Sequence, residues 1–250
     1  MEYGSLALYG DNPHAVSVEV YGTSSSTLLV QGSQPNLNIT LAREMETFTS
    51  GSLTGTGLVG DVTGFGVINL DSTLSVKNVS AYYLYIYLYG TNVGEYGRLV
   101  ASGDVSPSRG YLFPSAGFNP QAGQVFTIVE KTSPGPITNA FLGPEGTVIN
   151  LNGMPLRLSY VGGDGNDVTL TVVTPVPIVL SGLQRSFDTQ SVFSYSADVG
   201  LRYAVDHSAT LSNWTTIRSD TANVNPMTVT DTAATNRMNF YRVRRLANPP

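Results

Sequence analysis

Hydrophobic and polar residues alternate along most of this chain, in short runs separated by turns. A period of two places alternate side chains on opposite faces of a β-strand. The strictest run covers residues 82–89, where four tyrosines share one face: Tyr83, Tyr85, Tyr87 and Tyr89. The opposite face is aliphatic and is expected to be core: Leu84, Ile86 and Leu88. The pattern predicts an all-β protein with a row of tyrosines on one strand.

This tyrosine row has two interpretations. Tyrosine has a flat apolar ring with a polar tip, so an exposed row is a possible contact surface for sugars or another chain. Alternatively, the row lies under a covering strand or loop, or packs against a neighbouring domain. The sequence favours the covered arrangement slightly and leaves both open.

Glycines break up the pattern between residues 51 and 70, where short apolar pairs recur every few residues. Such frequent glycines weaken isolated strands. They suit a solenoid, in which short strands joined by tight corners stack on their neighbours. The alternative is a glycine-rich loop between ordinary strands.

The stretch Gly162-Gly-Asp-Gly-Asn-Asp167 lies between two alternating apolar runs. Its residue types favour a tight hairpin turn. The same letters nearly match a calcium-binding nonapeptide repeat, with oxygen ligands expected at Asp164, Asn166 and Asp167. Calcium in such repeats is held between two successive turns, and this chain has one copy. We therefore expect a hairpin turn here and no cofactor, with calcium as the less favoured alternative.

Four blocks occur in an order that resembles an autotransporter-type β-strand repeat region. They are Glu95–Val105, Phe118–Val129, Phe141–Val148 and Leu158–Leu170. The resemblance covers roughly residues 51–173 and implies the end of a parallel β-solenoid in a secreted, passenger-like bacterial protein. It supplies no catalytic residues. Residues 1–45 carry strand patterns but no clear solenoid rungs, so their membership stays open.

Prolines mark the next boundary. Thr174-Pro-Val-Pro-Ile178 is expected to be extended, because each proline fixes its own φ and restrains the preceding residue. Beyond it, the pattern predicts five strands: Val192–Tyr195, Leu201–His207, Trp214–Arg218, Met227–Thr230 and Asn239–Arg245. This region resembles the small C-terminal β-sandwich modules of large secreted bacterial proteins. In such a module Trp214, the only tryptophan, would anchor the core.

The predicted organisation is therefore all-β. Strands of uncertain membership (1–45) precede an autotransporter-like domain that is β-solenoid-like or β-sandwich-like (46–174). A proline-containing linker (175–182) leads to a small antiparallel β-sandwich (183–250).

Composition narrows the functional classes. Only 12% of the residues are charged and the net charge is −5, so no basic field attracts nucleic acid. Cysteine is absent, which excludes disulfides and cysteine-ligated metals. The sequence shows neither a signal peptide nor an apolar run long enough to span a membrane. We expect an extracellular or cell-surface chain exported as part of a longer precursor.

Residues suited to catalysis are sparse. Asp206, His207 and Ser208 are adjacent, and neighbours on a strand point to opposite faces, so they are not expected to form a triad. The remaining candidate carboxylates occur singly beside turns: Asp61, Asp71, Asp104 and Glu130. No enzyme activity is expected from this distribution.

The sequence favours a structural or adhesive protein that assembles with itself or with other cell-surface proteins through β-strand contacts. One alternative is a carbohydrate-binding accessory region of a secreted enzyme, which would hold polysaccharide on the tyrosine row. A second alternative is a β-solenoid polysaccharide lyase or hydrolase.

Overall fold

The computed structural model describes residues 5–14, 17–21, 26–43, 50–115, 118–186 and 189–247. In these ranges the regular structure is β-strand, and no helix is long and apolar enough to cross a membrane. The all-β prediction is confirmed. The chain divides into two compact units. Unit 1 contains residues 1–120, 124–147 and 158–171, and unit 2 contains residues 121–123, 148–157 and 172–250.

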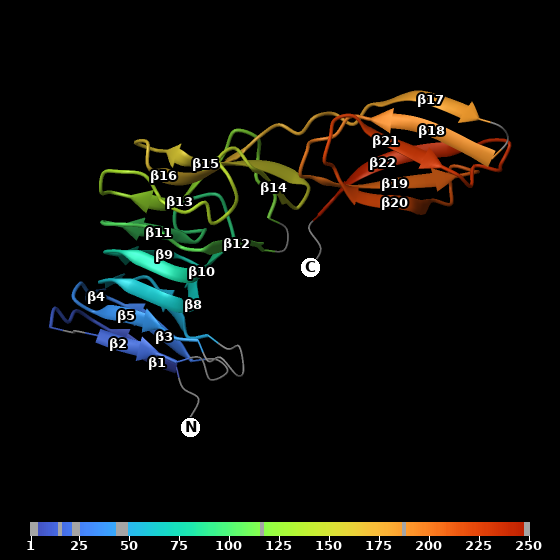
Figure 1. The fold of residues 1–250 in the computed structure, drawn as a ribbon. Helices are drawn as coiled ribbons and strands as arrows, with labels where there is room; N and C mark the ends of the chain where they lie inside the picture. Colours follow the sequence, from blue (N-terminus) through green and yellow to red (C-terminus); the bar gives the residue numbers. More distant parts are fainter. Residues whose placement is uncertain are drawn as a thin grey trace. The chain divides into compact units, whose positions relative to one another are not determined.

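Unit 1 is built on two parallel sheets between which the chain passes repeatedly (Figure 1). The first sheet contains β1 (Ser5–Tyr9), β2 (Ser17–Val20), β3 (Thr27–Gln31), β5 (Asn38–Leu41), β6 (Ser52–Gly55), β8 (Val62–Leu70), β10 (Val79–Leu88) and β12 (Arg109–Pro114). The second begins with β4 (Ser33–Gln34), β7 (Leu58–Val59), β9 (Thr73–Val76), β11 (Arg98–Ala101) and β13 (Val125–Lys131). This parallel alternation gives unit 1 a solenoid-like architecture.

The core of unit 1 is made of aliphatic side chains stacked from rung to rung. One stack follows the strand register through four buried residues: Leu28, Leu53, Ile68 and Leu84. Burying such a side chain contributes about 1.5–3 kcal/mol relative to leaving it exposed. Because each rung covers only its neighbours, stability comes from many stacked contacts rather than from one compact centre.

The first strands, whose membership the sequence left open, belong to the same sheets. β1 pairs in parallel with β3, and β2 pairs in parallel with β5. Val18, Ile39 and Val62 are aligned across β2, β5 and β8. The described residues between 5 and 41 are therefore part of the solenoid-like unit.

A ladder of asparagine and aspartate residues lines one corner of the rungs. The Asp61 backbone N–H donates to Asn38 Oδ1 at 3.0 Å, and Asn78 Nδ2 donates to Asp61 Oδ1 at 2.7 Å. The Asp104 backbone N–H then donates to Asn78 Oδ1 at 2.7 Å. These bonds satisfy polar groups at the turn and tie successive rungs together.

Antiparallel pairing closes the second sheet. β13 pairs antiparallel with β16 (Asp167–Val172), and β16 neighbours β15 (Met154–Gly162) across the turn at residues 163–166. The Gly165 N–H donates to the Gly162 carbonyl at 2.8 Å within this turn. The backbone of residues 162–167 therefore forms the hairpin turn that the sequence favours.

Unit 2 begins with a second hairpin. β14 (Val148–Leu151) pairs antiparallel with the first residues of β15. Asn152 and Gly153 have φ values of 52° and 87°, as a two-residue hairpin turn with positive φ at both positions requires. An Asn-Gly pair is the residue combination that favours this turn, because both residues tolerate positive φ.

The rest of unit 2 is a β-sandwich of two three-stranded antiparallel sheets (Figure 1). One sheet has the order β17-β18-β21 and the other has the order β20-β19-β22. The bounds are β17 (Leu180–Ser186), β18 (Gln190–Tyr195), β19 (Arg202–Ser208), β20 (Thr215–Thr221), β21 (Met227–Asp231) and β22 (Phe240–Leu246). Both sheets contribute to one core, which includes Phe193, Tyr203 and Val229.

Two features of unit 2 differ from expectation. β17 begins inside the segment expected to be a linker, because pairing with β18 orders it despite a register shift between Ser181 and Gln184. Trp214 does not anchor the core. Its indole N–H donates to the Leu211 carbonyl at 3.0 Å, and the Arg242 guanidinium lies 4.4 Å from its ring centre. The prediction for Trp214 was wrong, since Phe193 and Tyr203 fill the interior.

Candidate functional site

The tyrosine row lies on the outer face of the first sheet of unit 1. On β10, Leu84, Ile86 and Leu88 are fully buried. The strand alternation therefore directs the tyrosines to the opposite face. The neighbouring strand β12 adds two more rings, since Tyr85 is aligned with Tyr111 and Tyr87 with Phe113.

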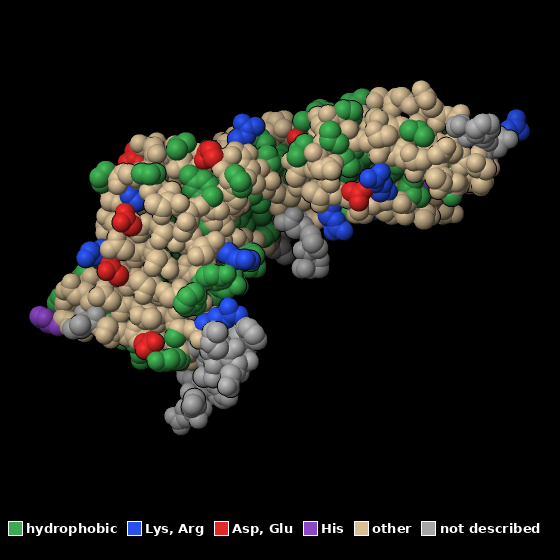
Figure 2. Space-filling model, in the orientation of Figure 1, with side chains coloured by type: hydrophobic (Ala, Val, Ile, Leu, Met, Phe, Trp, Pro, Cys, Tyr) green, Lys and Arg blue, Asp and Glu red, His purple; other side chains and the backbone are tan. Residues whose placement is uncertain are grey.

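We call the resulting surface the aromatic face. Its members are Tyr83, Tyr85, Tyr87, Tyr89, Tyr111 and Phe113. Three of these side chains are substantially exposed, with Tyr89 at 53%, Tyr111 at 41% and Phe113 at 37%. Figure 2 shows hydrophobic side chains gathered near the ends of β10 and β12, with basic side chains beside them. The remaining tyrosines of the row are half-buried.

The rings of the aromatic face contact one another. Tyr85 and Tyr111 are nearly perpendicular, with ring centres 5.4 Å apart, and Tyr87 lies 5.1 Å from Phe113 with an angle of 24° between their planes. Pairs of this kind contribute about 0.5–1.5 kcal/mol beyond their area burial. The ring planes vary in tilt, so the surface presents ring edges and hydroxyls as well as ring faces.

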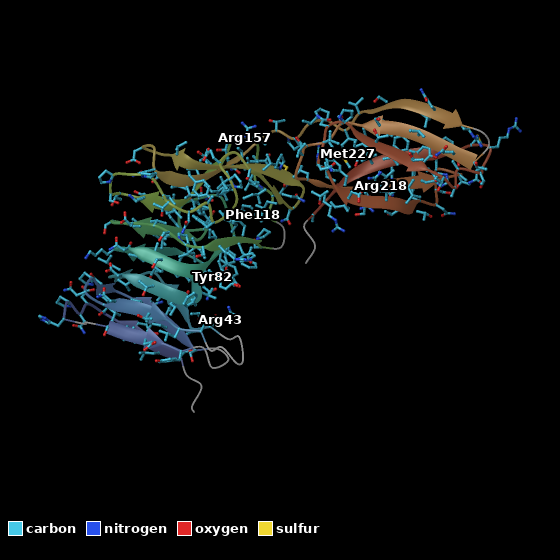
Figure 3. All side chains as sticks on the ribbon, in the orientation of Figure 1. Arg43, Tyr82, Phe118, Arg157, Arg218 and Met227 are labelled. Carbon is cyan, nitrogen blue, oxygen red and sulfur yellow. The ribbon has the colours of Figure 1, made fainter. Side chains whose placement is uncertain are left out.

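Arg109 borders the aromatic face. The hydrogen bond that Arg109 donates to Tyr111, followed by charge interaction with Tyr82, raises the pKa of Arg109. The guanidinium carbon lies 6.0 Å from the centre of the Tyr82 ring, which Figure 3 labels. Burial, followed by the neighbouring Tyr111, raises the pKa of Tyr85, so this phenol stays neutral at physiological pH. The face is therefore aromatic, rich in hydroxyls and positively charged at one end.

The calcium candidates have other partners. Asp167 Oδ1 accepts the backbone N–H of Lys131 at 2.9 Å, and Asn166 Nδ2 donates to the Ser133 carbonyl at 2.6 Å. Asp164 is exposed and lines a shallow hollow together with Asn166 and the loop at residues 134–136. Within the described ranges, no group of three His, Cys, Asp or Glu side chains is placed to hold a metal.

Sequence reasoning missed Lys131, which lies beside this turn and is buried, with 1% exposure. Its ammonium donates to the carbonyls of Ser133, Pro134 and Gly135 at 3.0, 2.9 and 3.1 Å. A lysine ammonium has three donors, so these carbonyls saturate it. The turn is tied to the loop that holds this ammonium, because Asn166 and Lys131 both donate to the Ser133 carbonyl. The Ser-Pro-Gly-Pro loop after Lys131 was the available signal.

We expect calcium chelation with EGTA to leave the melting temperature of the chain unchanged, because Asp167 and Asn166 bond to protein groups. Replacing Lys131 by Met should lower stability by about 1–3 kcal/mol, since three carbonyls would lose a buried donor. Thermal melting followed by circular dichroism tests both, and the variant shows that the assay detects damage at this turn. A drop in melting temperature on chelation would restore the calcium interpretation.

The candidate carboxylates do not converge. Asp61 and Asp104 belong to the corner ladder, and Asp71 Oδ1 accepts a hydrogen bond from Ser72 at 3.0 Å. Glu130 forms an ion pair with Arg98 across neighbouring strands.

Asp206, His207 and Ser208 also have separate partners. Asp206 is held by Arg242 and Arg244, and His207 Nε2 lies 2.8 Å from Asn239 Oδ1. Ser208 Oγ accepts the backbone N–H of Thr210 at 3.1 Å. The three side chains are not joined in a triad.

The aromatic face is thus the strongest candidate site. No family model, no curated protein and no solved structure matches this chain.

Proposed function

We propose that this chain is an extracellular or cell-surface structural protein that attaches to its own copies or to other surface proteins through the aromatic face. The observation that carries the proposal is the two-strand cluster of rings on β10 and β12, three of them substantially exposed. Tyrosine is favoured at protein interfaces because its ring buries apolar area while its hydroxyl keeps a hydrogen-bonding partner.

The architecture supports this role. Stacked parallel rungs hold the rings on adjacent strands, so the contact surface is organised before a partner arrives. The low content of charged residues, 12%, leaves few charges to solvate a large outer surface.

Carbohydrate binding is the second candidate, favoured by the exposed rings and by Arg109 at their border. Flat stacking against sugars needs ring faces in one plane. Tyr85 and Tyr111 are instead separated by an interplanar angle of 86°, so the arrangement fits an irregular protein surface better.

Replacing Tyr85 and Tyr87 together by alanine should weaken self-association by at least about tenfold, the loss expected from removing two aromatic anchors. Sedimentation velocity over a concentration series measures this, and electron microscopy shows the assemblies. The matched control replaces Tyr9 and Tyr21, two exposed tyrosines outside the aromatic face, and should leave association unchanged.

Retention on insoluble cellulose, chitin or peptidoglycan separates the two candidates. If the wild-type chain binds one of them and the Tyr85/Tyr87 variant does not, carbohydrate binding replaces the proposed protein contact. A wild-type chain that neither associates nor adheres to immobilised surface proteins would contradict the proposal.

A further inference from the structure

The two open sides of the unit 2 sandwich differ. On one side, Arg218 Nη1 of β20 donates to the Thr228 carbonyl of β21 at 3.0 Å, so a polar bridge spans the gap between the sheets. Figure 3 labels Arg218 and Met227, which mark these two strands. On the other side, a hollow of about 390 Å³ lies between β17 and β22. The side between β20 and β21 is bridged at this point, and the side between β17 and β22 contains a hollow.

The open side is largely apolar and reaches the core. Its lining includes Leu180, Leu183, Phe193, Phe240 and Tyr241. Phe193 belongs to the core cluster and is 2% exposed, whereas Leu183 at the rim is 62% exposed. A second hollow of about 310 Å³ shares Leu183, Phe240 and Tyr241 and continues along the same side. We call the two hollows together the sandwich groove.

Edge strands border the sandwich groove. Among the described strands, β17 pairs only with β18, and β22 pairs only with β19. Each therefore has one side on which backbone N–H and C=O groups lack a strand partner, and such an edge can accept another strand. Arg242 and Arg244 of β22 both donate to Asp206 of the neighbouring strand β19, so their guanidinium groups bond within their own sheet.

The charges of the sandwich groove favour an acidic partner. The described residues that line the second hollow include Arg185 and Arg237 and no Asp or Glu. Arg185 also donates to the carbonyls of Ala234, Asn236 and Arg237, which fixes its guanidinium at this end. A negatively charged side chain arriving there would meet charges of opposite sign.

We propose that the sandwich groove binds an extended, alternating apolar peptide segment with an acidic residue, supplied by another polypeptide. The segment adds a strand to the free edge of β22 and extends the order β20-β19-β22 by one. Its alternate side chains enter the hollow beside Leu183 and Phe193, and its acidic residue faces Arg237, which is exposed and lines the second hollow. This inference concerns unit 2 and is independent of the aromatic face.

The test uses the full chain and a fluorescein-labelled peptide of alternating valine and threonine with one terminal glutamate. Fluorescence anisotropy should show binding, and Leu183→Lys should weaken it by at least about tenfold, because a charge at the rim opposes apolar side chains. The matched control is Val224→Lys, a similarly exposed position (52%) in the loop between β20 and β21. A peptide with the same composition in blocks rather than alternation should bind more weakly.

Amide hydrogen exchange identifies the edge. Strand addition predicts slower exchange in β22 when peptide is present, while Tyr85→Ala/Tyr87→Ala leaves peptide binding intact. Absence of binding at millimolar peptide, equal binding by Leu183→Lys, or protection confined to another strand would overturn the inference. So would dimerisation of the chain alone that Leu183→Lys abolishes, since the occupant would then be a second copy.

Discussion

Replacing Gly64 by alanine should lower the stability of unit 1 by more than about 3 kcal/mol, enough to unfold a marginally stable domain. Gly64 has a φ of +106°, a conformation that L side chains rarely adopt. It lies within β8 and pairs with Leu41 of β5, three residues before Val67, where pairing with β6 begins. A Cβ here would overlap the Leu41 carbonyl of the rung below. Both atoms are held by the backbone, so the clash cannot relax through a rotamer change.

Gly94→Ala separates the clash from the backbone strain. Gly94 has a similar φ of +95°, and a Cβ built there meets nothing within 4 Å. Replacing it by alanine should lower the free energy of unfolding by about 1 kcal/mol or slightly more, because only the backbone strain contributes. Urea unfolding followed by circular dichroism reports the whole chain, and fluorescence of Trp214 reports unit 2. Equal losses in the two variants would show that rung-to-rung contact at Gly64 is unimportant.

The sequence predicted strands and turns well where the structure depends on residues that are adjacent in the chain. The alternation in residues 82–89 identified both faces of β10, because each buried leucine or isoleucine is followed by an outward tyrosine. The pair Asn152-Gly153 is a local signal of the same kind, since both residues tolerate the positive φ that its hairpin turn imposes.

Rung pairing was harder to predict because the rungs differ in length. The aligned positions Thr27, Ser52, Val67 and Tyr83 are separated by unequal stretches of chain, so no fixed period appears in the sequence. For the same reason, no repeat is recognisable in the sequence of the first strands, although the described residues between 5 and 41 form rungs.

The candidate site was half visible in the sequence. The tyrosine row was clear, but its extension by Tyr111 and Phe113 depends on the register between β10 and β12, which are joined by a long connection. Lys131 was missed because a buried lysine depends on carbonyls that the loop at 133–135 provides only when folded. Trp214 was misplaced because Phe193 and Tyr203, which are also aromatic, occupy the interior.

Asp206→Asn should destabilise unit 2 by about 2 kcal/mol at neutral pH. Burial opposes ionisation of Asp206, but hydrogen bonds from Thr216, Arg244 and Arg242 outweigh it and lower the pKa from 3.8 to about 2. A pKa lowered from 3.8 to about 2 on folding corresponds to about 2 kcal/mol of stability. Because the folded pKa is the lower one, this stability is present above about pH 4 and is lost as the pH falls toward 2.

The pH dependence separates this group from the other carboxylates of unit 2. Urea unfolding monitored by Trp214 fluorescence should show a stability difference between wild type and Asp206→Asn that shrinks from pH 7 to pH 2. Asp220→Asn is the matched control, since its ion pair with Arg218 is exposed and should contribute at most about 1 kcal/mol. A difference that stays constant across this pH range would mean that Asp206 acts through shape and hydrogen bonding rather than charge. In that case Trp214 would position Arg242, and Thr216 would position Arg244. The charge of Asp206 would then not be what joins β19, β20 and β22.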